Sequence, residues 1–165
     1  GVIGLMAVQL AKLAGAEVLL LTRSPDKQAL GLNIGADYAV STESEVKNIW
    51  SEGADLVVEC AGVSATVTLS HKLTRSGGRV VILGVISQGE QVPIEPFDML
   101  FREIQMHFSF LNPFTHERAA KMIADGTINV SPLISRTISL EEAALAISSP
   151  PPKGEVRAIV VPNHD

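Results

Sequence analysis

Continuous apolar runs alternate along the chain with segments in which apolar residues recur at helical spacing. The runs Val18–Leu21, Leu56–Val58 and Val80–Leu83 contain no polar position. Such runs are typical of parallel strands that are covered on both faces. In residues 3–13, apolar side chains recur every three or four positions, which predicts an amphipathic helix. The pattern therefore favours buried parallel strands joined by helices.

A glycine followed by alanine and an acidic residue recurs where each predicted helix gives way to a strand, at Gly15–Glu17, Gly35–Asp37 and Gly53–Asp55. A glycine just past the last helical turn takes the left-handed conformation that ends a helix. The repeat therefore indicates the order helix, cap, strand. It predicts an α/β fold, a Rossmann-type doubly wound parallel sheet in a three-layer arrangement.

The pattern changes after Gly84, where the sequence becomes rich in loop-forming residues. Residues 103–110 predict a further strand, and Thr115–Gly126 predicts a helix with Thr115 as its cap and Gly126 as its end. We expect this strand and helix to complete the α/β layers.

The last part of the chain predicts a smaller unit. A helix begins after Ser139, with Glu142 at the capping-box position, and a final strand covers residues 155–162. We therefore expect an NAD(P)-binding Rossmann-like domain over residues 1–126, truncated at its N-terminus, and a C-terminal segment over residues 127–165.

Composition and charge argue against several classes of partner. The net charge is −5 and the basic residues are scattered singly, so we expect no binding to nucleic acid. The apolar runs are too short to cross a bilayer and no signal peptide is visible, so we expect no membrane association. A single cysteine, Cys60, fits a reducing compartment, and we expect a cytoplasmic location.

Metal chemistry within the chain is not expected, because a structural zinc site needs about four Cys or His ligands at close spacing. The histidines are far apart in sequence and form no HExxH pattern: His71, His107, His116 and His164. We expect each of them to lie on the surface or to pack in the core.

The first residues, Gly1-Val2-Ile3-Gly4, match the end of a GxGxxG dinucleotide fingerprint. In this interpretation Gly1 lets the backbone approach a pyrophosphate, and Gly4 lets the helix pack closely on a strand. The helix N-terminus would then direct its amides at the phosphates. The alternative is that the glycines simply begin a helix.

The residue that should meet the adenosine ribose lies about 20 positions after the glycines, at the end of the second strand. Here Thr22 stands in place of an acidic residue and Arg23 follows it. Thr22 does not repel a 2′-phosphate, and the guanidinium of Arg23 suits one, so we expect NADP(H) to be favoured over NAD(H). We include Ser24 and Lys27 in this cofactor-binding group. The alternative is that Arg23 and Lys27 are ordinary solvated cations.

Several segments together carry a resemblance to a known family: "GVIGLMAVQLAKLAGAEVLLLTRSPDK", "GADLVVECAG", "TRSGGRVVILGV" and "SPLISRTISLEEAALAI". They resemble the coenzyme-binding half and C-terminal return of the medium-chain, zinc-dependent alcohol and polyol dehydrogenases, most closely the sorbitol dehydrogenase branch. NADP(H)-using members of this family carry a small residue followed by Arg, as Thr22 and Arg23 do. The resemblance implies further cofactor-binding residues, namely Cys60, Ala61, Gly62, Leu83, Gly84, Val85, Ser109 and Phe110.

The resemblance also implies what the chain lacks. Polyol dehydrogenases of this type carry an Arg-Tyr pair where this chain has Leu111-Asn112, which argues against a sugar alcohol as substrate. The family places its zinc ligands and proton relay in an N-terminal GroES-like domain, so we expect no catalytic residue and no metal ligand in this chain. The complete protein would transfer hydride between NAD(P)(H) and a secondary alcohol or ketone, as a dimer or tetramer. The chain alone is expected to be inactive.

Other interpretations remain open from the sequence. One is the zinc-free quinone oxidoreductase branch, which shares this coenzyme-binding half. Another is a stand-alone dinucleotide-binding or interaction module, and a third is an α/β domain without ligand affinity.

In the strand order 3-2-1-4-5-6 the first strand is central, and the chain shows no strand before Gly1. We therefore expect a vacant position between the strands that begin near Val18 and Leu56. Either the chain is a piece of a longer protein, or a borrowed strand fills the position. The candidate for borrowing is "EVRAIVVP", residues 155–162.

Overall fold

The computed structural model describes residues 1–162. Its helices are α1 (Val2–Leu13), α2 (Pro25–Asn33), α3 (Glu43–Ile49), α4 (Ser64–Leu73), α5 (Pro96–Phe101), α6 (His116–Ala124), the short 3-10 helix η1 (Ser131–Leu133) and α7 (Leu140–Ser148). Its strands are β1 (Leu19–Leu21), β2 (Tyr38–Val40), β3 (Ala54–Glu59), β4 (Thr74–Ile82), β5 (Gln105–Phe108), β6 (Ile134–Ile138) and β7 (Arg157–Val160). Helices and strands alternate as the hydrophobic pattern predicts.

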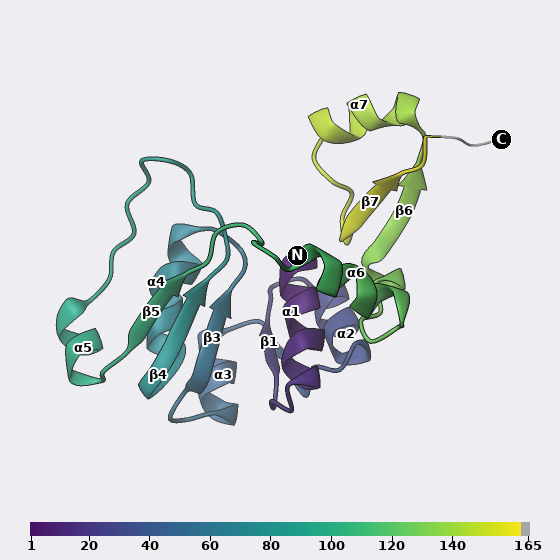
Figure 1. Ribbon diagram of the computed structural model, residues 1–165. Helices are drawn as coiled ribbons and strands as arrows, with labels where there is room; N and C mark the ends of the chain where they lie inside the picture. The colour runs from purple at the N-terminus through teal and green to yellow at the C-terminus, as the bar shows by residue number, and fades with distance from the viewer. Residues whose placement is uncertain (163–165) are drawn as a thin grey trace.

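All described strand pairs are parallel. β1 pairs with β2, and β3, β4 and β5 pair in that order. Figure 1 shows β3, β4 and β5 side by side, with β1 beside α1 and apart from β3. This arrangement is the doubly wound Rossmann type with its central strand position vacant, so the predicted fold class is confirmed.

The strands in the structure do not begin and end where the apolar runs that predicted them begin and end. Strand β4 begins at Thr74 rather than Val80, because the polar segment before Val80 also extends beside β3. Leu83 lies beyond β4, and its backbone N–H donates to the Glu59 carbonyl at 2.8 Å. The apolar runs therefore predicted the positions of the strands but not their ends. Val80 and Ile82 of β4 are buried as expected, whereas Leu56 and Val58 of β3 are 47% and 38% exposed.

The helix boundaries follow local hydrogen bonding. The Ser24 hydroxyl accepts from the Lys27 amide, and Ser139 and Glu142 form the predicted capping box of α7. The prediction for Thr115 is wrong in one respect, because its side chain makes no cap hydrogen bond. Thr115 has helical φ and ψ of −106° and −9°, and its hydroxyl donates instead to the Asn112 carbonyl.

The glycines predicted to end helices have left-handed backbone conformations. Gly15, Gly35 and Gly53 have φ values of 82°, 111° and 92°. Gly126, the predicted end of α6, has a φ of 76°. A residue with a side chain is strained in this region, so these glycines set the points where the chain turns from helix to strand.

Of the two alternatives for the central position, the structure contradicts the one in which residues 155–162 are borrowed to fill it. Strand β7 pairs in parallel with β6 and leaves the facing edges of β1 and β3 unpaired with each other. The reason is local: β6 and β7 are joined through α7, which is the usual parallel crossover. The pair is therefore made within the C-terminal segment, at the end of the molecule shown in yellow in Figure 1.

The core lies between the sheet and its covering helices. One cluster joins α4 to β4 and includes Val67, Val80 and Ile82. A second joins β2, α3 and α4 through Val40, Val46 and Leu73. Burial of these side chains holds the strands and helices together and thereby positions the loops at the carboxyl ends of the strands.

Candidate functional site

Most of the predicted cofactor residues lie at one edge of the sheet. Thr22 follows β1, Cys60 follows β3, Leu83 follows β4 and Ser109 follows β5. Because the strands within each sheet are parallel, their carboxyl ends meet at a common edge. Ligands of doubly wound folds bind at this edge, where the strand order reverses.

The N-terminus of α1 lies at the same edge. Gly1 is its N-cap, and a side-chain carbon built on Gly4 would lie 3.6 Å from the Cβ of Cys60 at the end of β3. No acidic residue occupies the first turn of α1 and no side chain caps it. The first amides of a helix lack partners within the helix and carry partial positive charge, so they suit an anionic group. Val2 and Ile3 belong to this first turn.

The turns after β3 and β4 pack backbone against backbone. A Cβ built on Gly84 would lie 2.2 Å from the Gly62 nitrogen, and one built on Gly62 would lie 2.6 Å from the Val85 oxygen. Gly62 also has a φ of 68°. Only glycine fits at both places, so the two predicted turns, 60–62 and 83–85, form one structural unit.

A buried carboxylate that the sequence analysis missed holds these turns. Glu59 is only 4% exposed, and its Oε1 accepts from the amides of Ala61 and Gly62 at 2.8 and 3.0 Å. The Thr66 hydroxyl donates to the same oxygen at 2.6 Å. The sequence signal that points to it is a single acidic residue at the end of a strand that is otherwise apolar from Leu56.

The residues after β1 are held by short-range hydrogen bonds. The Gln28 side-chain amide donates to the Thr22 carbonyl at 2.8 Å, and the Ser24 amide donates to the Thr22 hydroxyl at 3.5 Å. Arg23 is exposed, and within residues 1–162 no acidic side chain forms an ion pair with it. The Arg23 guanidinium is therefore available to an anion beside the turn.

Lys27 belongs to the same region. It lies in the first turn of α2, where its backbone amide donates to the Ser24 hydroxyl at 3.4 Å. The segment Thr22–Lys27 therefore joins the carboxyl end of β1 to the first turn of α2.

Cys60 is not reactive in this setting. Burial of the thiol, together with the negative charge of Glu59, raises its pKa to about 11. The thiol is therefore neutral near neutral pH, and its contact is a weak 3.8 Å hydrogen bond to the Val58 carbonyl. Cys60 contributes shape to the turn rather than a nucleophile or a metal ligand.

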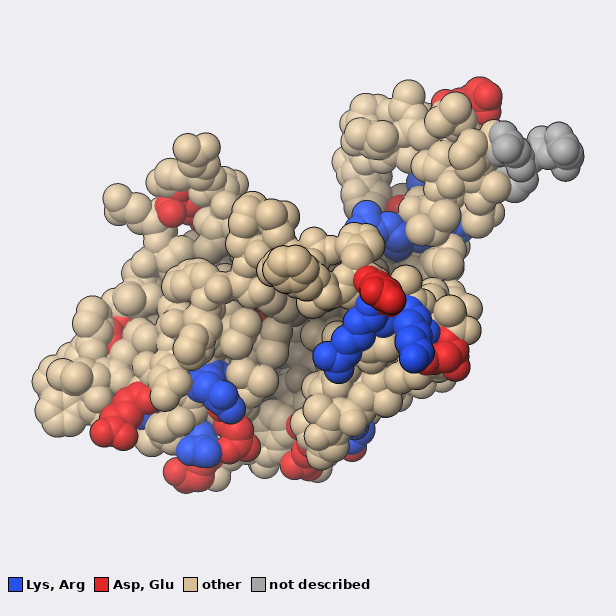
Figure 2. Space-filling model, viewed as in Figure 1, with Lys and Arg blue, Asp and Glu red and all other residues tan. Residues whose placement is uncertain are grey.

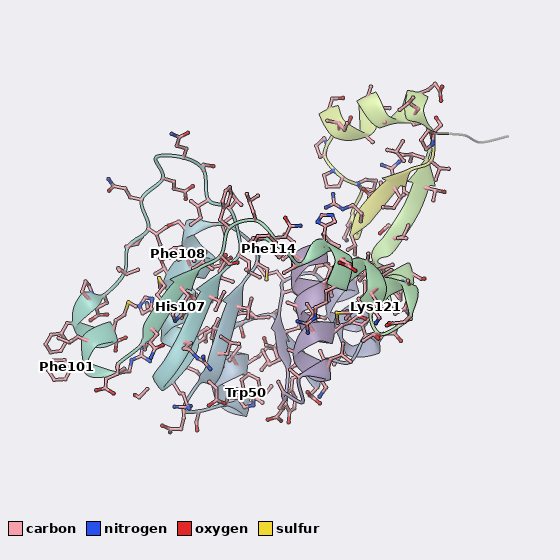
Figure 3. All side chains as sticks on the ribbon, viewed as in Figure 1. Trp50, Phe101, His107, Phe108, Phe114 and Lys121 are labelled. Carbon is pink, nitrogen blue, oxygen red and sulfur yellow. The ribbon has the colours of Figure 1, made fainter. Side chains whose placement is uncertain are left out.

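The part of the carboxyl edge at the end of β5 carries exposed apolar side chains. The Ser109 amide donates to the Ile82 carbonyl at 3.0 Å and prolongs the ladder beyond β5. Phe110 is 78% exposed, and Figure 3 shows Phe108 at the end of β5 and Phe114 in the segment that crosses to α6. The predicted Ser109–Phe110 pair therefore lies next to the turn that follows β4.

A separate cavity lies away from this edge. It has a volume of about 410 Å³ and is lined by residues such as Trp50, Gly53 and Thr74, at the amino ends of β3 and β4. Its cations are largely neutralised, since Lys47 pairs with Glu43. The chemistry that suits a dinucleotide is at the carboxyl edge, which is an open surface rather than this cavity.

Charge and metal ligands are sparse on the described surface. Figure 2 shows Lys and Arg side chains interspersed with acidic ones on the face it draws. Within residues 1–162, no three His, Cys, Asp or Glu side chains gather to hold a metal, and no helix is long and apolar enough to cross a membrane. His164 lies outside the described residues.

Comparisons with known proteins give the family. Residues 2–126 match the zinc-binding dehydrogenase family. Sorbitol dehydrogenase from Gallus gallus is 30% identical over 158 residues, which cover 90% of this chain and 44% of that protein. Sorbitol dehydrogenase from Rattus norvegicus is 27% identical over the same shares of the two chains.

Solved structures agree. A protein from Sinorhizobium meliloti 1021, assigned as a zinc-binding dehydrogenase and bound to NADP, is 48% identical with a TM-score of 0.94 over 98% of this chain and 50% of that chain. Alcohol dehydrogenase TADH from Thermus sp. ATN1 is 26% identical with a TM-score of 0.88 over 99% and 50%. The chain spans about half the length of these relatives. The chain therefore belongs to the zinc-binding dehydrogenase family, as the resemblance in its motifs predicts.

Proposed function

We propose that this chain is the NADP(H)-binding half of an alcohol or polyol dehydrogenase that transfers hydride to or from a secondary alcohol or ketone. The observation that carries the proposal is a half-buried Thr22 followed by an exposed Arg23 that forms no ion pair within residues 1–162, at the end of β1. An acidic residue at Thr22 would repel a 2′-phosphate, whereas Arg23 attracts one.

The roles of the site residues follow their places along the edge. The amides of the first turn of α1, residues 1–4, would hold the pyrophosphate. Thr22, Arg23, Ser24 and Lys27 would surround the 2′-phosphate of the adenosine ribose. The turns 60–62 and 83–85, with Ser109 and Phe110, would support the nicotinamide half.

The chain's part in the reaction is to bind and orient the dinucleotide. The nicotinamide ring supplies the hydride acceptor or donor when the cofactor is bound. The residues present do not fit a zinc site, because residues 1–162 gather no ligand cluster. Activation of the alcohol or carbonyl is therefore assigned to another part of the complete protein.

The division into residues 1–126 and 127–165 is part of the proposal. The C-terminal β6–β7 pair stands apart from the other sheets, and a lone two-stranded sheet is marginally stable. Helix α7 leaves Leu140, Leu145 and Ile147 at 60%, 70% and 86% exposure. We infer that another part of the protein covers this surface and that a further strand completes the sheet between β1 and β3.

We also propose an oligomeric state and a cellular location for the protein. Exposed Phe108 and Phe110 near the free edge of β5 support a homo-oligomer, a dimer or tetramer. The single cysteine supports a cytoplasmic location.

Separate calorimetric titrations with NADPH and NADH test the cofactor proposal. A charge-assisted hydrogen bond contributes about 1.5 to 3 kcal/mol, so NADPH should bind roughly tenfold to hundredfold more tightly than NADH. The Arg23→Ala variant should lose this preference while its affinity for NADH is unchanged. Arg118→Ala, in the exposed helix α6, is the matched control and should keep the preference. Equal affinities in the wild type, with no effect of Arg23→Ala, contradict the proposal.

A further inference from the structure

Glu59 connects the two turns at the carboxyl edge by its side chain and its backbone at once. Its carboxylate accepts hydrogen bonds from the turn after β3, at Ala61 and Gly62. Its backbone carbonyl accepts from Leu83 and Gly84, in the turn after β4, at 2.8 and 3.0 Å. One buried residue therefore fixes both turns relative to each other.

The surroundings of the carboxylate leave it little freedom. Its Oε2 would lie 2.4 Å from a Cβ built on Gly84, and the Thr66 hydroxyl on α4 holds Oε1 at 2.6 Å. Glu59 is 4% exposed and has no cationic partner within residues 1–162. A buried carboxylate without a cation is costly unless hydrogen bonds satisfy it, and here donors from the turns and from α4 do so.

We propose that Glu59 is a positioning residue for the nicotinamide half of the bound dinucleotide, an inference that rests on the proposed cofactor function. A dinucleotide crosses the sheet at the point where the strand order reverses, which here lies between β1 and β3. Its adenosine half then lies over β1 and its nicotinamide half over β3 and β4. Glu59 acts on the second half only, through the shape of the turns, because its carboxylate is buried beneath them.

The choice of side chain follows from the hydrogen bonds. Oε1 accepts from Ala61, Gly62 and Thr66, and Oε2 accepts only a longer bond from Gly62 at 3.3 Å. Glutamine keeps an acceptor oxygen at this position, whereas alanine leaves the amides without a partner. The positioning role therefore predicts that Glu59→Gln retains most of the function that Glu59→Ala loses.

The test uses the full chain and two probes, NADPH and adenosine 2′,5′-bisphosphate, in calorimetric titrations. Glu59→Ala should weaken NADPH binding by at least about tenfold and change adenosine 2′,5′-bisphosphate binding by less than about twofold. Glu59→Gln should remain within about threefold of the wild type for both probes, and Thr66→Val should weaken NADPH binding by an intermediate factor. The control is Glu142→Ala, which removes a carboxylate cap on α7, remote from the edge, and should change neither affinity.

Amide hydrogen exchange by NMR gives a readout that needs no cofactor. Exchange at Ala61 and Gly62 should accelerate by at least about tenfold in Glu59→Ala and by less in Thr66→Val. Unchanged amide exchange at Ala61 and Gly62 in Glu59→Ala overturns the inference. An equal loss of affinity for NADPH and for adenosine 2′,5′-bisphosphate in this variant also overturns it, because that result indicates general destabilisation. If Glu59→Ala does not fold, the NADPH affinities of Glu59→Gln and Thr66→Val test the inference instead. An unchanged NADPH affinity in Thr66→Val overturns it. A wild type that binds neither probe instead contradicts the proposed function itself, and this outcome is distinct from the others.

Discussion

His71 is a buried titratable side chain that makes stability depend on pH. It lies on α4 at 1% exposure, and neither ring nitrogen has a hydrogen-bond partner within the described residues. Burial lowers the pKa of the ring, and the nearby charges of Arg102 and Lys72 act in the same direction. The carboxylates of Asp98 and Glu95 oppose this shift without reversing it.

The sign of the effect follows from linkage. The unfolded chain takes up the proton near the ordinary histidine pKa of about 6.5, whereas folded His71 resists protonation until a lower pH. Stability is therefore fully present above about pH 6.5 and falls as the pH drops toward the lowered pKa of the folded protein. Within that window the loss reaches at most about 1.4 kcal/mol for each pH unit.

Urea denaturation of the wild type and of His71→Leu at about pH 7.5, 6.5 and 5.5 measures the effect. Leucine fills a similar volume without unsatisfied nitrogens, so His71→Leu should be more stable than the wild type by about 1 to 3 kcal/mol, and by more at low pH. Carboxylates such as Asp98 contribute their own acid dependence, which both proteins share. An equal fall in stability with pH in the two proteins refutes this account of His71.

Two further changes test the geometry of the carboxyl edge. Gly84→Ala should destabilise the chain by about 1 to 3 kcal/mol in urea denaturation, because its Cβ would lie 2.2 Å from the Gly62 nitrogen. Gly4→Ala, with an ordinary 3.6 Å contact to Cys60, should cost less, and equal losses contradict the packing of the turns. Cys60, with a pKa of about 11, should react with iodoacetamide at about pH 8 roughly two-hundredfold more slowly than free cysteine. A rate like that of free cysteine contradicts the burial of the thiol.

The architecture was predictable because local signals agreed with one another. Unbroken apolar runs such as Val80–Leu83 are typical of parallel strands, and Gly15, Gly35 and Gly53 each end a helix for the same conformational reason. Strand ends were less predictable. Pairing with β3 extends β4 back to Thr74, although residues 75–79 are polar or glycine.

The parts that escaped prediction depend on contacts distant in sequence. The position of β7 follows from its crossover through α7 to β6, which the apolar pattern of residues 155–162 alone does not reveal, so the sequence left the borrowed-strand alternative open. The role of Glu59 depends on Leu83 and Gly84, more than twenty positions away, which meet it only in the folded sheet. The Thr22-Arg23 pair, by contrast, could be proposed from the sequence because its interpretation depends only on its distance from the glycines along the chain.

In the proposed function, the end of β1 selects a 2′-phosphate. The most direct measurement is the ratio of the NADH and NADPH dissociation constants in the wild type and in Thr22→Asp. Thr22→Asp places a carboxylate where the ribose hydroxyls would bind, so the wild type should prefer NADPH by about tenfold or more and the variant should prefer NADH. A ratio that is the same in both proteins contradicts the account.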